Sequence, residues 1–424
     1  MAKNLKEKFQ KRVIKKPNKL LAHIGIAVLK NMCRKKKVTF SYDYDPKQYK
    51  NTSCILLSTH PSRLDFINVL SGFDRKDVNI VVGYGNIMKK YVYTPLKHLG
   101  AICKYLYQPD ITCTKNMLSV LKRNGSLVLF PEGIQSNTGS THPINPATCK
   151  LLKKSKVHIF LAKSTGPYLC TNRYSKDVKK GPVHVHYSLL FTPEELATLT
   201  EDQIYNKLIE HFRYNEFEAN RTDRRVYVGK LPNIAGLDNI IYICPHCHQE
   251  YTFSVENQTM TCSHCGYAVS MNEYYDLLPV NKELVFDDID KWYKWQRKVV
   301  REQVRQEGFE LTMRGKLTRL RDDKLKKAPN DVVTVAEGQI TLNKDGLVVL
   351  RDDGTQESFS IKGIYSLYFS KNLTLEFFYN EEFYKIYPQI EQKYLPKWTL
   401  ASEELHNLVD EKWHSASSDV YDYE

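Results

Sequence analysis

Long apolar segments are missing from this sequence, and their absence excludes a large class of proteins. The apolar run from Leu20 to Leu29 is interrupted by His23 and leads into lysines. A helix that spans a bilayer needs about 20 apolar residues, so we predict no transmembrane helix. The basic start is followed by Pro17 and no small-residue cleavage site is visible, so no signal peptide is expected.

A disulfide framework is also missing, although the chain has ten cysteines. Four of them form two C-x-x-C pairs, which are treated below. The other six show no framework spacing; they are Cys33, Cys54, Cys103, Cys113, Cys149 and Cys170. This usage indicates a protein of a reducing compartment.

Acidic residues are almost absent from residues 1–37. This segment has thirteen Lys or Arg but only Glu7 of opposite sign, so it holds +12 of the net charge of +14. Among the basic residues, apolar ones recur at helical spacing in 3–15 and again after Asn18. The apolar positions are Leu5, Phe9, Val13, Leu20, Leu21, Ile24, Val28 and Met32. We predict two basic amphipathic helices.

Such helices are suited to a membrane surface. Anionic lipid attracts each nearby Lys or Arg with about 1 kcal/mol, and the apolar stripe can enter the headgroup boundary. We expect a peripheral protein at the cytoplasmic face of a membrane. The alternatives are a solvated charged arm or a nucleic-acid tail.

Residues 38–217 alternate between strand-like and helix-like patterns, which predicts an α/β domain with a partly parallel sheet, extending to about residue 230. The expected strands are 38–44, 54–59, 79–83, 100–107, 126–130, 156–162 and 183–191, and the expected helices are 62–72, 112–124, 147–154 and 193–213. Near the end of the domain, Arg221, Arg224 and Arg225 form a basic cluster that we expect in a solvated linker.

Two polar turns follow apolar strands in this domain. His60 and Asp65 follow the first strand, and Glu132 with Gly133 follows another about seventy residues later. In open α/β sheets, ligands collect at such carboxyl ends. Five residues on an ideal helix leave two side chains about 140° apart, so His60 and Asp65 meet only if His60 precedes the helix that contains Asp65. An aspartate placed there would hold one imidazole nitrogen and leave the other as a base.

These turns resemble sequence blocks of the glycerolipid acyltransferase family, which includes the 1-acylglycerol-3-phosphate acyltransferases. H-x-x-x-x-D at His60 and Asp65 resembles the first block, and F-P-E-G at 130–133 resembles the third. The segments 83–90 and 99–105 are similar to the second block, and 158–162 to the fourth, without its usual prolines. The resemblance covers about half of the chain. It implies an α/β fold and transfer of a fatty acyl group from a thioester to a hydroxyl.

The resemblance also implies roles for the turn residues. His60 would be the general base that takes the proton of the acceptor's hydroxyl, and Asp65 would orient its ring. Glu132 would help to position the acceptor. The chain at Gly133 can approach a ligand closely and could offer N–H donors.

Two positions depart from the family. Where it usually has an arginine after the second block, this chain has Lys104 and Tyr105, and in place of E-G-T-R-S it has Gln135. Those arginines are thought to grip the acceptor's phosphate, and a guanidinium makes bidentate contacts that glutamine and tyrosine cannot. We expect the charge to come instead from Arg63, Lys89, Lys90 or Lys104, unless the acceptor is a lipid whose phosphate is masked or absent.

Residues 240–270 carry the second specific pattern. Cys244 and Cys247, fourteen intervening residues, then Cys262 and Cys265 give the ligand spacing of a zinc ribbon. Four thiolates would close a structural zinc site. The segment 248–261 between the pairs has no Lys or Arg, so nucleic acid is an unlikely partner.

The C-terminal part, 281–414, is predicted to be a helix followed by a β-rich domain. The helix starts near Asp288 and runs to about Gln306. Expected strands are 309–320, 332–342, 346–351, 356–361, 364–369, 372–379 and 382–387, with a last helix at about 401–413. The arrangement resembles a pleckstrin-homology-like barrel. Residues 415–424 are expected to be disordered.

The predicted fold is thus an α/β acyltransferase domain, a four-cysteine zinc ribbon and a β-rich C-terminal domain. The predicted function is acyl transfer from acyl carrier protein or acyl-coenzyme A to a lysophospholipid such as 1-acylglycerol-3-phosphate, in phospholipid synthesis or remodelling. Two alternatives stay open. One is a non-catalytic zinc-ribbon adaptor that binds lipid, protein or nucleic acid, and the other is an acyltransferase that uses a non-phosphate acceptor.

Overall fold

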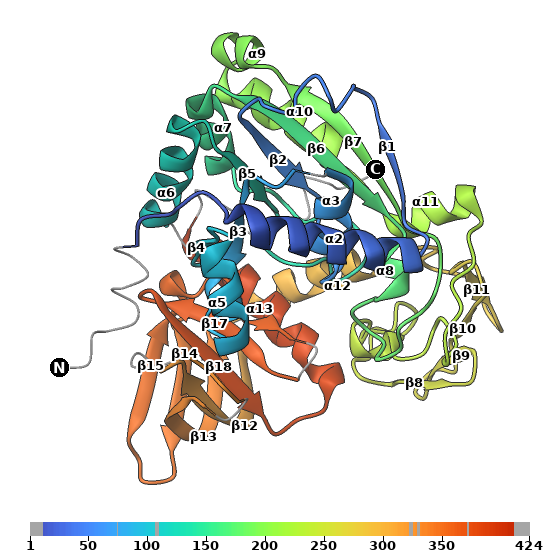
Figure 1. Cartoon of the computed structure of the whole chain (residues 1–424). Helices are drawn as coiled ribbons and strands as arrows, with labels where there is room; N and C mark the ends of the chain where they lie inside the picture. The colour runs from blue at the N-terminus through green and yellow to red at the C-terminus, as the bar shows by residue number, and fades with distance from the viewer. Residues whose placement is uncertain are drawn as a thin grey trace.

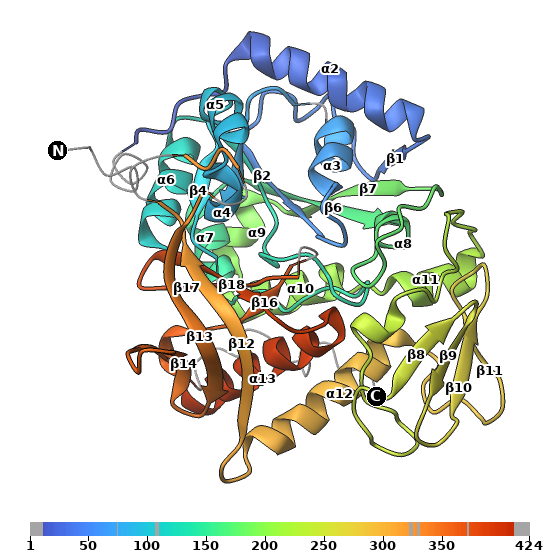
Figure 2. The same ribbon diagram turned by 90° about the horizontal axis from the view of Figure 1, so that it is seen from below.

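Three β-sheets organise the chain in the computed structural model, which describes residues 12–73, 75–106, 110–321, 325–328, 331–370 and 373–410. The first is the sheet of the α/β domain, the second surrounds the four cysteines and the third forms the C-terminal domain. Figures 1 and 2 show the second and third sheets on the same side of the α/β domain, with the long helix α12 between them.

The first sheet has seven strands in the order β1-β7-β6-β2-β5-β3-β4. Neighbouring strands are parallel except for β6 and β7, so the prediction of a partly parallel sheet is confirmed. The strands are β1 (Thr39–Tyr42), β2 (Cys54–Ser58), β3 (Val78–Gly83), β4 (Ile102–Lys104), β5 (Ser126–Leu129), β6 (His158–Thr165) and β7 (His184–Phe191). The central strands β2 and β5 are fully buried because helices cover both faces.

Two groups of helices cover this sheet. On one face, α2 and α3 pack against apolar residues of β2, β6 and β7, and on the other α6, α7, α9 and α10 bury a second cluster. The helices are α2 (Lys19–Lys35), α3 (Asp65–Phe73), α4 (Tyr84–Ile87), α5 (Lys90–His98), α6 (Ile111–Lys122), α7 (Ala147–Ser155), α8 (Pro167–Cys170), α9 (Pro193–Thr198), α10 (Glu201–Phe212) and α11 (Glu216–Asp223).

The sequence predictions differ from this domain in several places. They omit the short helices α4, α8 and α11. The strand expected at 100–107 is only β4. The helix expected at 193–213 is two helices, because Thr200 accepts a hydrogen bond from the Gln203 amide and starts α10 anew. Residues 90–98 form α5 although it contains Pro95, which the pattern analysis left without a helix.

In the N-terminal segment, the described residues contain the second of the two expected helices. Residues 3–11 lie outside the described part, and 12–18 are not helical. The second helix is confirmed as α2, with the side chain of Asn18 accepting a hydrogen bond from the Leu21 amide. Among the described residues, no helix combines the length and the apolar character needed to cross a membrane.

The second sheet has the strand order β11-β10-β9-β8 and is antiparallel throughout. Its strands are β8 (Phe253–Glu256), β9 (Thr259–Cys262), β10 (Ala268–Met271) and β11 (Leu277–Pro279), preceded by the short 3-10 helix η1 (Leu237–Asn239). The apolar residues of this small unit join one continuous core with α12 and the C-terminal domain. It is therefore packed into the molecule rather than tethered to it.

The third sheet confirms the predicted β-rich domain. Its seven strands are antiparallel in the order β15-β14-β13-β12-β18-β17-β16. They are β12 (Glu310–Arg319), β13 (Val333–Asn343), β14 (Gly346–Arg351), β15 (Gln356–Ser360), β16 (Tyr368–Phe369), β17 (Leu375–Tyr379) and β18 (Glu382–Pro388), with 3-10 helices η2 (Ile361–Gly363) and η3 (Gln392–Tyr394). The resemblance to a pleckstrin-homology-like barrel stays a prediction.

Two helices flank the third sheet. The helix expected from Asp288 is α12 (Ile289–Val304). The last helix is α13 (Leu395–Val409), so the predicted start near Ser402 is wrong: the helix begins seven residues earlier, with Pro396 in its first turn, where proline is tolerated. The predicted disorder of 415–424 concerns residues outside the described part.

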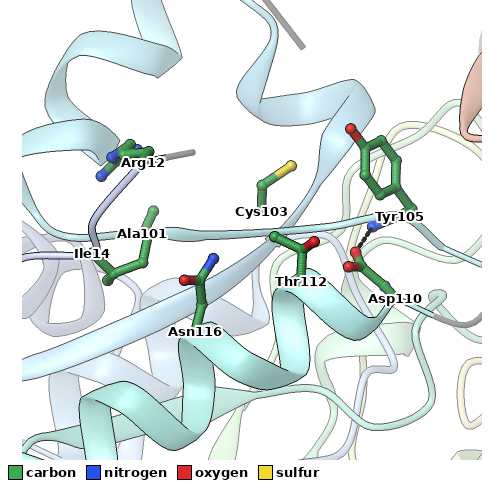
Figure 3. A pocket seen from close by; sticks show the side chains of 8 residues that line it. All are labelled: Arg12, Ile14, Ala101, Cys103, Tyr105, Asp110, Thr112 and Asn116. Carbon is green, nitrogen blue, oxygen red and sulfur yellow. Dashed lines mark hydrogen bonds between the residues drawn. The ribbon is translucent and has the colours of Figure 1, made fainter. Parts of the chain in front are cut away.

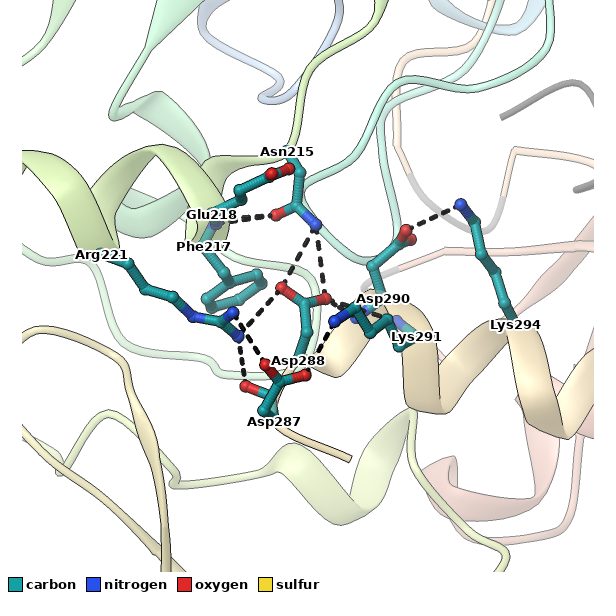
Figure 4. A network of polar contacts seen from close by, with 9 residues as sticks. All are labelled: Asn215, Phe217, Glu218, Arg221, Asp287, Asp288, Asp290, Lys291 and Lys294. Carbon is teal, nitrogen blue, oxygen red and sulfur yellow. Dashed lines mark hydrogen bonds and ion pairs between the residues drawn. The ribbon is translucent and has the colours of Figure 1, made fainter. Parts of the chain in front are cut away.

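Polar side chains fix α12 to the α/β domain (Figure 4). Asn215 caps α11 with its carbonyl oxygen, and its amide nitrogen lies 3.3 Å from both carboxylate oxygens of Asp288. Asp288 in turn caps α12 by accepting from the amides of Asp290 and Lys291. Arg221 pairs with Asp287 at 3.1 Å and with Asp288 at 3.4 Å. Each helix start is therefore tied to the other.

The prediction that the basic cluster of Arg221, Arg224 and Arg225 lies in a solvated linker is therefore wrong. Arg221 contacts the start of α12, Arg224 pairs with Asp276 at 2.5 Å and Arg225 pairs with Asp223 at 3.0 Å. These contacts join α11 to the cysteine-bearing unit and to α12. Sequence alone does not show which carboxylates face an arginine.

An apolar contact also joins α4 to the third sheet. Tyr84 and Tyr105 of the α/β domain share an apolar cluster with Phe378 and Phe383 of β17 and β18. A Cβ added at Gly85 would lie 3.0 Å from the ring of Phe383. The C-terminal domain thus packs directly on the carboxyl edge of the first sheet.

Candidate active site

His60 lies in the turn between β2 and α3, at the carboxyl edge of the first sheet. Leu57 of β2 is in register with Leu129 of β5, so His60 and Glu132 follow neighbouring strands at the same level. The amide of Thr59 donates to the carbonyl of Ala162 on β6, which fixes the start of the turn. Parallel neighbours therefore bring the two sequence blocks together.

The side chains of His60 and Asp65 meet in this turn. His60 Nδ1 lies 3.0 Å from Asp65 Oδ2, and Asp65 is the first residue of α3. The same carboxylate oxygen accepts from the Ser62 amide at 2.7 Å. Asp65 is fully buried, whereas the His60 side chain is 19% exposed. With Nδ1–H donating to the carboxylate, Nε2 carries the lone pair and is the nitrogen left for a ligand.

Burial raises the pKa of Asp65, while the hydrogen bond and charge of His60 lower it. The other carboxylate oxygen, Oδ1, is buried and has no hydrogen-bond partner among the described residues. Asp65 therefore depends on the imidazole and the Ser62 amide for its polar contacts. The carboxylate is therefore placed to orient the ring through Nδ1.

Glu132 connects the two motif turns. Its Oε1 accepts from the His60 amide and its Oε2 from the His142 amide, both at 2.8 Å. The side chain is buried, and burial raises the pKa of Glu132 to about 8 against the opposing effect of these two hydrogen bonds. Both oxygens are engaged by main chain, so the Glu132 side chain holds the two loops together.

Gly133 follows with a φ of +75°, a conformation that favours glycine. No atom lies within 4 Å of the place of its missing Cβ, which leaves room for a ligand beside the backbone. Its amide, however, donates to the carbonyl of Phe130 at 3.0 Å. The expected N–H donor to a ligand is thus not supplied by Gly133.

Arg63 and Lys104, which were predicted to bind substrate, differ in their position relative to His60. Arg63 is exposed in the turn that holds His60. Lys104 ends β4, three strands away from β2, which corresponds to about 14 Å. Its Nζ donates to the carbonyl of Tyr105 at 2.8 Å, and burial lowers the pKa of Lys104. The structure does not bring Lys104 to His60.

A small cavity lies at this outer strand (Figure 3). Its volume is about 20 Å³, enough for a water molecule but not for an acyl chain. Asp110 lies at one end, accepting from the Tyr105 amide at 2.8 Å. The lining residues are Arg12, Ile14, Ala101, Cys103, Tyr105, Asp110, Thr112 and Asn116. None of the motif-turn residues lines it.

The four cysteines predicted as metal ligands come together at the second sheet. All four Sγ atoms lie within 4.8 Å of one another. The Sγ atoms of Cys244 and Cys265 are 3.7 Å apart, and those of Cys247 and Cys262 are 3.8 Å apart. Zn–S bonds of about 2.3 Å in a tetrahedron place sulfurs about 3.8 Å apart. The cluster therefore fits a structural zinc ion.

Sequence reasoning missed polar residues that come to the carboxyl edge from other segments. His142 contacts Glu132 through its amide, and Thr171 contacts Ser62 through a 2.8 Å hydroxyl pair. Arg173 follows two residues later and is 7% exposed. These residues belong to loops after β5 and α8 and share no motif. Only their position after the ends of parallel strands could have drawn attention to them.

Comparison with known proteins gives matches to the α/β domain. Residues 40–160 match the family model described as Acyltransferase. A curated 1-acyl-sn-glycerol-3-phosphate acyltransferase from Cocos nucifera is 25% identical over 162 residues, covering 37% of this chain and 51% of that protein. The chain thus spans about half the length of this relative. The crystal structure of the 1-acyl-sn-glycerophosphate acyltransferase PlsC from Thermotoga maritima aligns with a TM-score of 0.39 and 14% identity, covering 45% of this chain and 76% of that one.

Proposed function

We propose that this chain, whose family match supports an acyltransferase enzyme, transfers a fatty acyl group from an acyl thioester to the hydroxyl of a lysophospholipid such as 1-acylglycerol-3-phosphate. The observation that carries the proposal is the 3.0 Å contact between His60 Nδ1 and Asp65 Oδ2. It lies within the segment that matches the family. Acyl carrier protein and coenzyme A are the candidate donors.

The proposed reaction uses His60 as general base. Nε2 takes the hydroxyl proton while the oxygen attacks the thioester carbonyl carbon. The C–S bond then breaks, and the leaving thiolate receives a proton from the imidazolium. Asp65 stabilises that imidazolium through Nδ1. General-base help of this kind contributes about 10²- to 10⁴-fold in rate.

Glu132 has a positioning role in this proposal. By accepting from the amides of His60 and His142, it fixes the turn that carries the base relative to the loop after β5. A base must lie within hydrogen-bond reach of the proton that it removes, so the position of the turn affects the rate directly.

The acceptor could also lack a phosphate. The family's two arginine positions are occupied here by residues such as Tyr105 and Gln135, and Lys104 is remote from His60. This observation favours a monoacylglycerol-like hydroxyl as the second candidate acceptor. The assay below includes both kinds of acceptor.

We further propose that α2 binds an anionic membrane surface. Its buried face holds Ala22, Ile26 and Cys33. Its exposed face presents a stripe of Leu20, Ile24 and Val28 with basic residues at both ends, including Lys19 and Lys35. Vesicles with anionic lipid should bind the protein more strongly at low salt than at high salt. Equal binding to neutral vesicles at high salt would refute the electrostatic part.

The four cysteines are proposed to hold one structural zinc ion. Bound zinc would stabilise a unit whose own core is small. Metal analysis should find one zinc per chain, and Cys262→Ser should release it and lower the melting temperature. A zinc-free, equally stable wild type would contradict this role.

The central experiment is detection of acylated product by mass spectrometry. Purified protein is given acyl-coenzyme A or acyl carrier protein thioesters with lysophospholipids and monoacylglycerols, and wild type is compared with His60→Ala. His211→Ala is the matched control, because that ring lies on α10 and its Nδ1 is 2.8 Å from the carbonyl oxygen of Lys207, outside the motif turns. We expect His60→Ala to lose at least about 100-fold in rate. If folded, zinc-loaded wild type forms no product, the non-catalytic adaptor becomes the better explanation.

A further inference from the structure

The short helix α8 contacts both the turn that holds His60 and the cysteine-bearing unit, which contains the second sheet. It follows β6, whose carboxyl end lies beside that of β2 because the two strands are parallel neighbours. Tyr168 and Leu169 of this helix are fully buried, and Thr171 after it is 7% exposed. We call residues 166–171 the α8 segment. A helix of four residues is not stable by itself, so its position depends on tertiary contacts.

One end of the α8 segment contacts the turn through a pair of hydroxyls. Thr171 Oγ1 lies 2.8 Å from Ser62 Oγ, and Ser62 is 2% exposed. Each hydroxyl has a single proton. Because Thr171 donates its proton to the Pro167 carbonyl at 3.2 Å, Ser62 is the donor in the hydroxyl pair. The Ser62 oxygen in turn accepts from the Leu64 amide at 3.2 Å. Both buried hydroxyls are thus fully used.

Ser62 also holds the carboxylate of Asp65. Its amide donates to Asp65 Oδ2 at 2.7 Å, and the same oxygen lies 3.0 Å from His60 Nδ1. The other oxygen, Oδ1, has no hydrogen-bond partner among the described residues. A displacement of Ser62 would therefore move the oxygen that orients the imidazole.

The cysteine-bearing unit contacts the α8 segment through Tyr275. This residue lies in the turn between β10 and β11, is 3% exposed, and donates its hydroxyl proton to the Leu169 carbonyl at 2.9 Å. Its ring packs edge-on against Phe217 of α11, with 5.9 Å between the ring centres, and Phe217 packs in the same way on Tyr168. Leu169 and Thr171 are two residues apart, so the cysteine-bearing unit and the turn contact the same short helix.

Glu216 fixes the start of the α8 segment. Its Oε1 and Oε2 accept from the Gly166 amide at 2.9 and 2.8 Å, and Oε1 also accepts from the Tyr168 amide at 3.3 Å. Glu216 is the first residue of α11, and the residue before it, Asn215, lies 3.3 Å from the carboxylate that caps α12. The α8 segment is therefore held at its start by α11 and further along by the cysteine-bearing unit.

We propose that Tyr275 and Thr171 are positioning residues for the reaction at His60. The proposal rests on the proposed acyl transfer, and it gives a role to the cysteine-bearing unit, which lies outside the residues that match the family model. The Tyr275 hydroxyl fixes α8, and α8 places Thr171. Thr171 in turn holds, through Ser62, the carboxylate of Asp65. A small displacement of a catalytic group lowers the rate of the chemical step without removing a contact to the substrate.

The first test separates the chemical step from substrate binding in the full-length protein. Thr171→Val removes a hydroxyl at nearly constant volume, and Tyr275→Phe removes only a hydroxyl. Each should lower kcat about 3- to 30-fold and leave the KM of the thioester and of the lysophospholipid within about 2-fold. Thr171→Ser keeps the hydroxyl and should restore kcat to about half of wild type or more.

Tyr274→Phe is the matched control for this test. The Tyr274 ring packs on the Arg224 guanidinium, 3.9 Å from the ring centre, and keeps this contact as phenylalanine, so kcat should not change. An unchanged kcat in both Thr171→Val and Tyr275→Phe, or an equal loss in the control, would overturn the positioning role.

A second test needs no acyl transfer and therefore separates this proposal from the proposed function. Hydrogen exchange of the amides in residues 59–66 is measured by mass spectrometry in the same variants. Thr171→Val and Tyr275→Phe should raise the exchange rate of this segment about 3- to 10-fold, and Tyr274→Phe should leave it unchanged. If Thr171→Val does not fold, Ser62→Ala, which removes the other hydroxyl of the pair, replaces it.

The two tests can fail independently. If wild type forms no product but exchange rises as expected, the acyl transfer is refuted and the link from Tyr275 to the turn is supported. If wild type forms product and exchange rises while kcat stays unchanged in both variants, the position of the turn does not limit the reaction, and the positioning role is refuted although the acyl transfer stands.

Discussion

The motif turns differ in their buried polar atoms from a group of side chains behind them, Asn137, His142, Arg173 and Tyr293, which we call the junction cluster. In the turns, both oxygens of Glu132 and one oxygen of Asp65 accept hydrogen bonds of 2.7–3.0 Å. In the junction cluster, four buried polar atoms have no partner among the described residues. Satisfied atoms fix a geometry, whereas unsatisfied atoms leave binding capacity for a ligand. The difference indicates which of the two regions is held in place by its own hydrogen bonds.

Among the substitutions that test this difference, Asp65→Asn has the largest expected effect. One carboxylate oxygen takes both the His60 and Ser62 hydrogen bonds, so an asparagine carbonyl in its place can keep both. The substitution then removes only the negative charge that stabilises the imidazolium. We expect kcat to fall about 10- to 100-fold with little change in stability.

Steady-state kinetics and urea unfolding measure the two effects. Asp77→Asn is the control for kcat, since that carboxylate is 53% exposed and pairs with Arg75 rather than with a residue of the motif turns. An unchanged kcat in Asp65→Asn would mean that the charge of Asp65 does not assist the reaction.

Glu132→Gln tests the motif turns, whose buried carboxylate oxygens accept hydrogen bonds, by its effect on the free energy of unfolding. An amide NH₂ cannot accept a hydrogen bond, so the main-chain N–H of His60 or His142 would lose its partner. We expect the free energy of unfolding to fall by about 1–3 kcal/mol. The control Glu302→Gln, at a side chain that is 73% exposed, should change it by less than about 0.5 kcal/mol. Equal stability of both variants would contradict the structural role of Glu132.

The pH dependence of stability sharpens the same comparison. Burial raises the pKa of Glu132 to about 8, from about 4.3 in an unfolded chain. A carboxyl with a raised folded-state pKa binds more protons when folded, so its contribution is full below about pH 4.3 and is lost as the pH rises through 8. Wild type should therefore lose stability relative to Glu132→Gln between about pH 5 and 8. Urea unfolding at several pH values measures this, and a constant difference would exclude the raised pKa.

The smallest expected effect comes from a substitution in the junction cluster. Tyr293→Phe removes a buried hydroxyl that has no hydrogen-bond partner among the described residues. The free energy of unfolding should stay within about 0.5 kcal/mol of wild type or increase. A loss of more than about 1 kcal/mol in urea unfolding would show that the hydroxyl is satisfied, and the contrast between the two regions would fail.

Sequence patterns were sufficient wherever the relevant contacts are local or follow strand order. Asn18 as helix cap, His60 and Glu132 after neighbouring strands, and the four cysteines all lie where the patterns placed them. Lys104 was misplaced as a neighbour of His60, because strand order, which sequence does not reveal, puts β4 at the sheet edge.

The junction cluster was beyond reach for a different physical reason. Its members are up to 156 residues apart, between Asn137 and Tyr293, and are joined only by tertiary packing of α12 on the α/β domain. The hydrogen bond from the Gly133 amide to the Phe130 carbonyl was likewise not predictable, because a turn's internal hydrogen bonds depend on backbone angles that a motif does not specify. Arg221 and its neighbours were judged solvated because their carboxylate partners follow more than fifty residues later.

The contact between Gly85 and Phe383 limits how this chain can be cut into fragments or recombined with a homologue. A Cβ at Gly85 of the α/β domain would lie 3.0 Å from the ring of Phe383, which would have to shift, and Tyr84, Tyr105, Phe378 and Phe383 form one apolar cluster across the two domains. A fragment that ends after α11 would expose its part of that cluster to water and would be prone to aggregate. The two halves are therefore matched parts, and recombination that exchanged one half for a distant homologue's would have to replace both surfaces together.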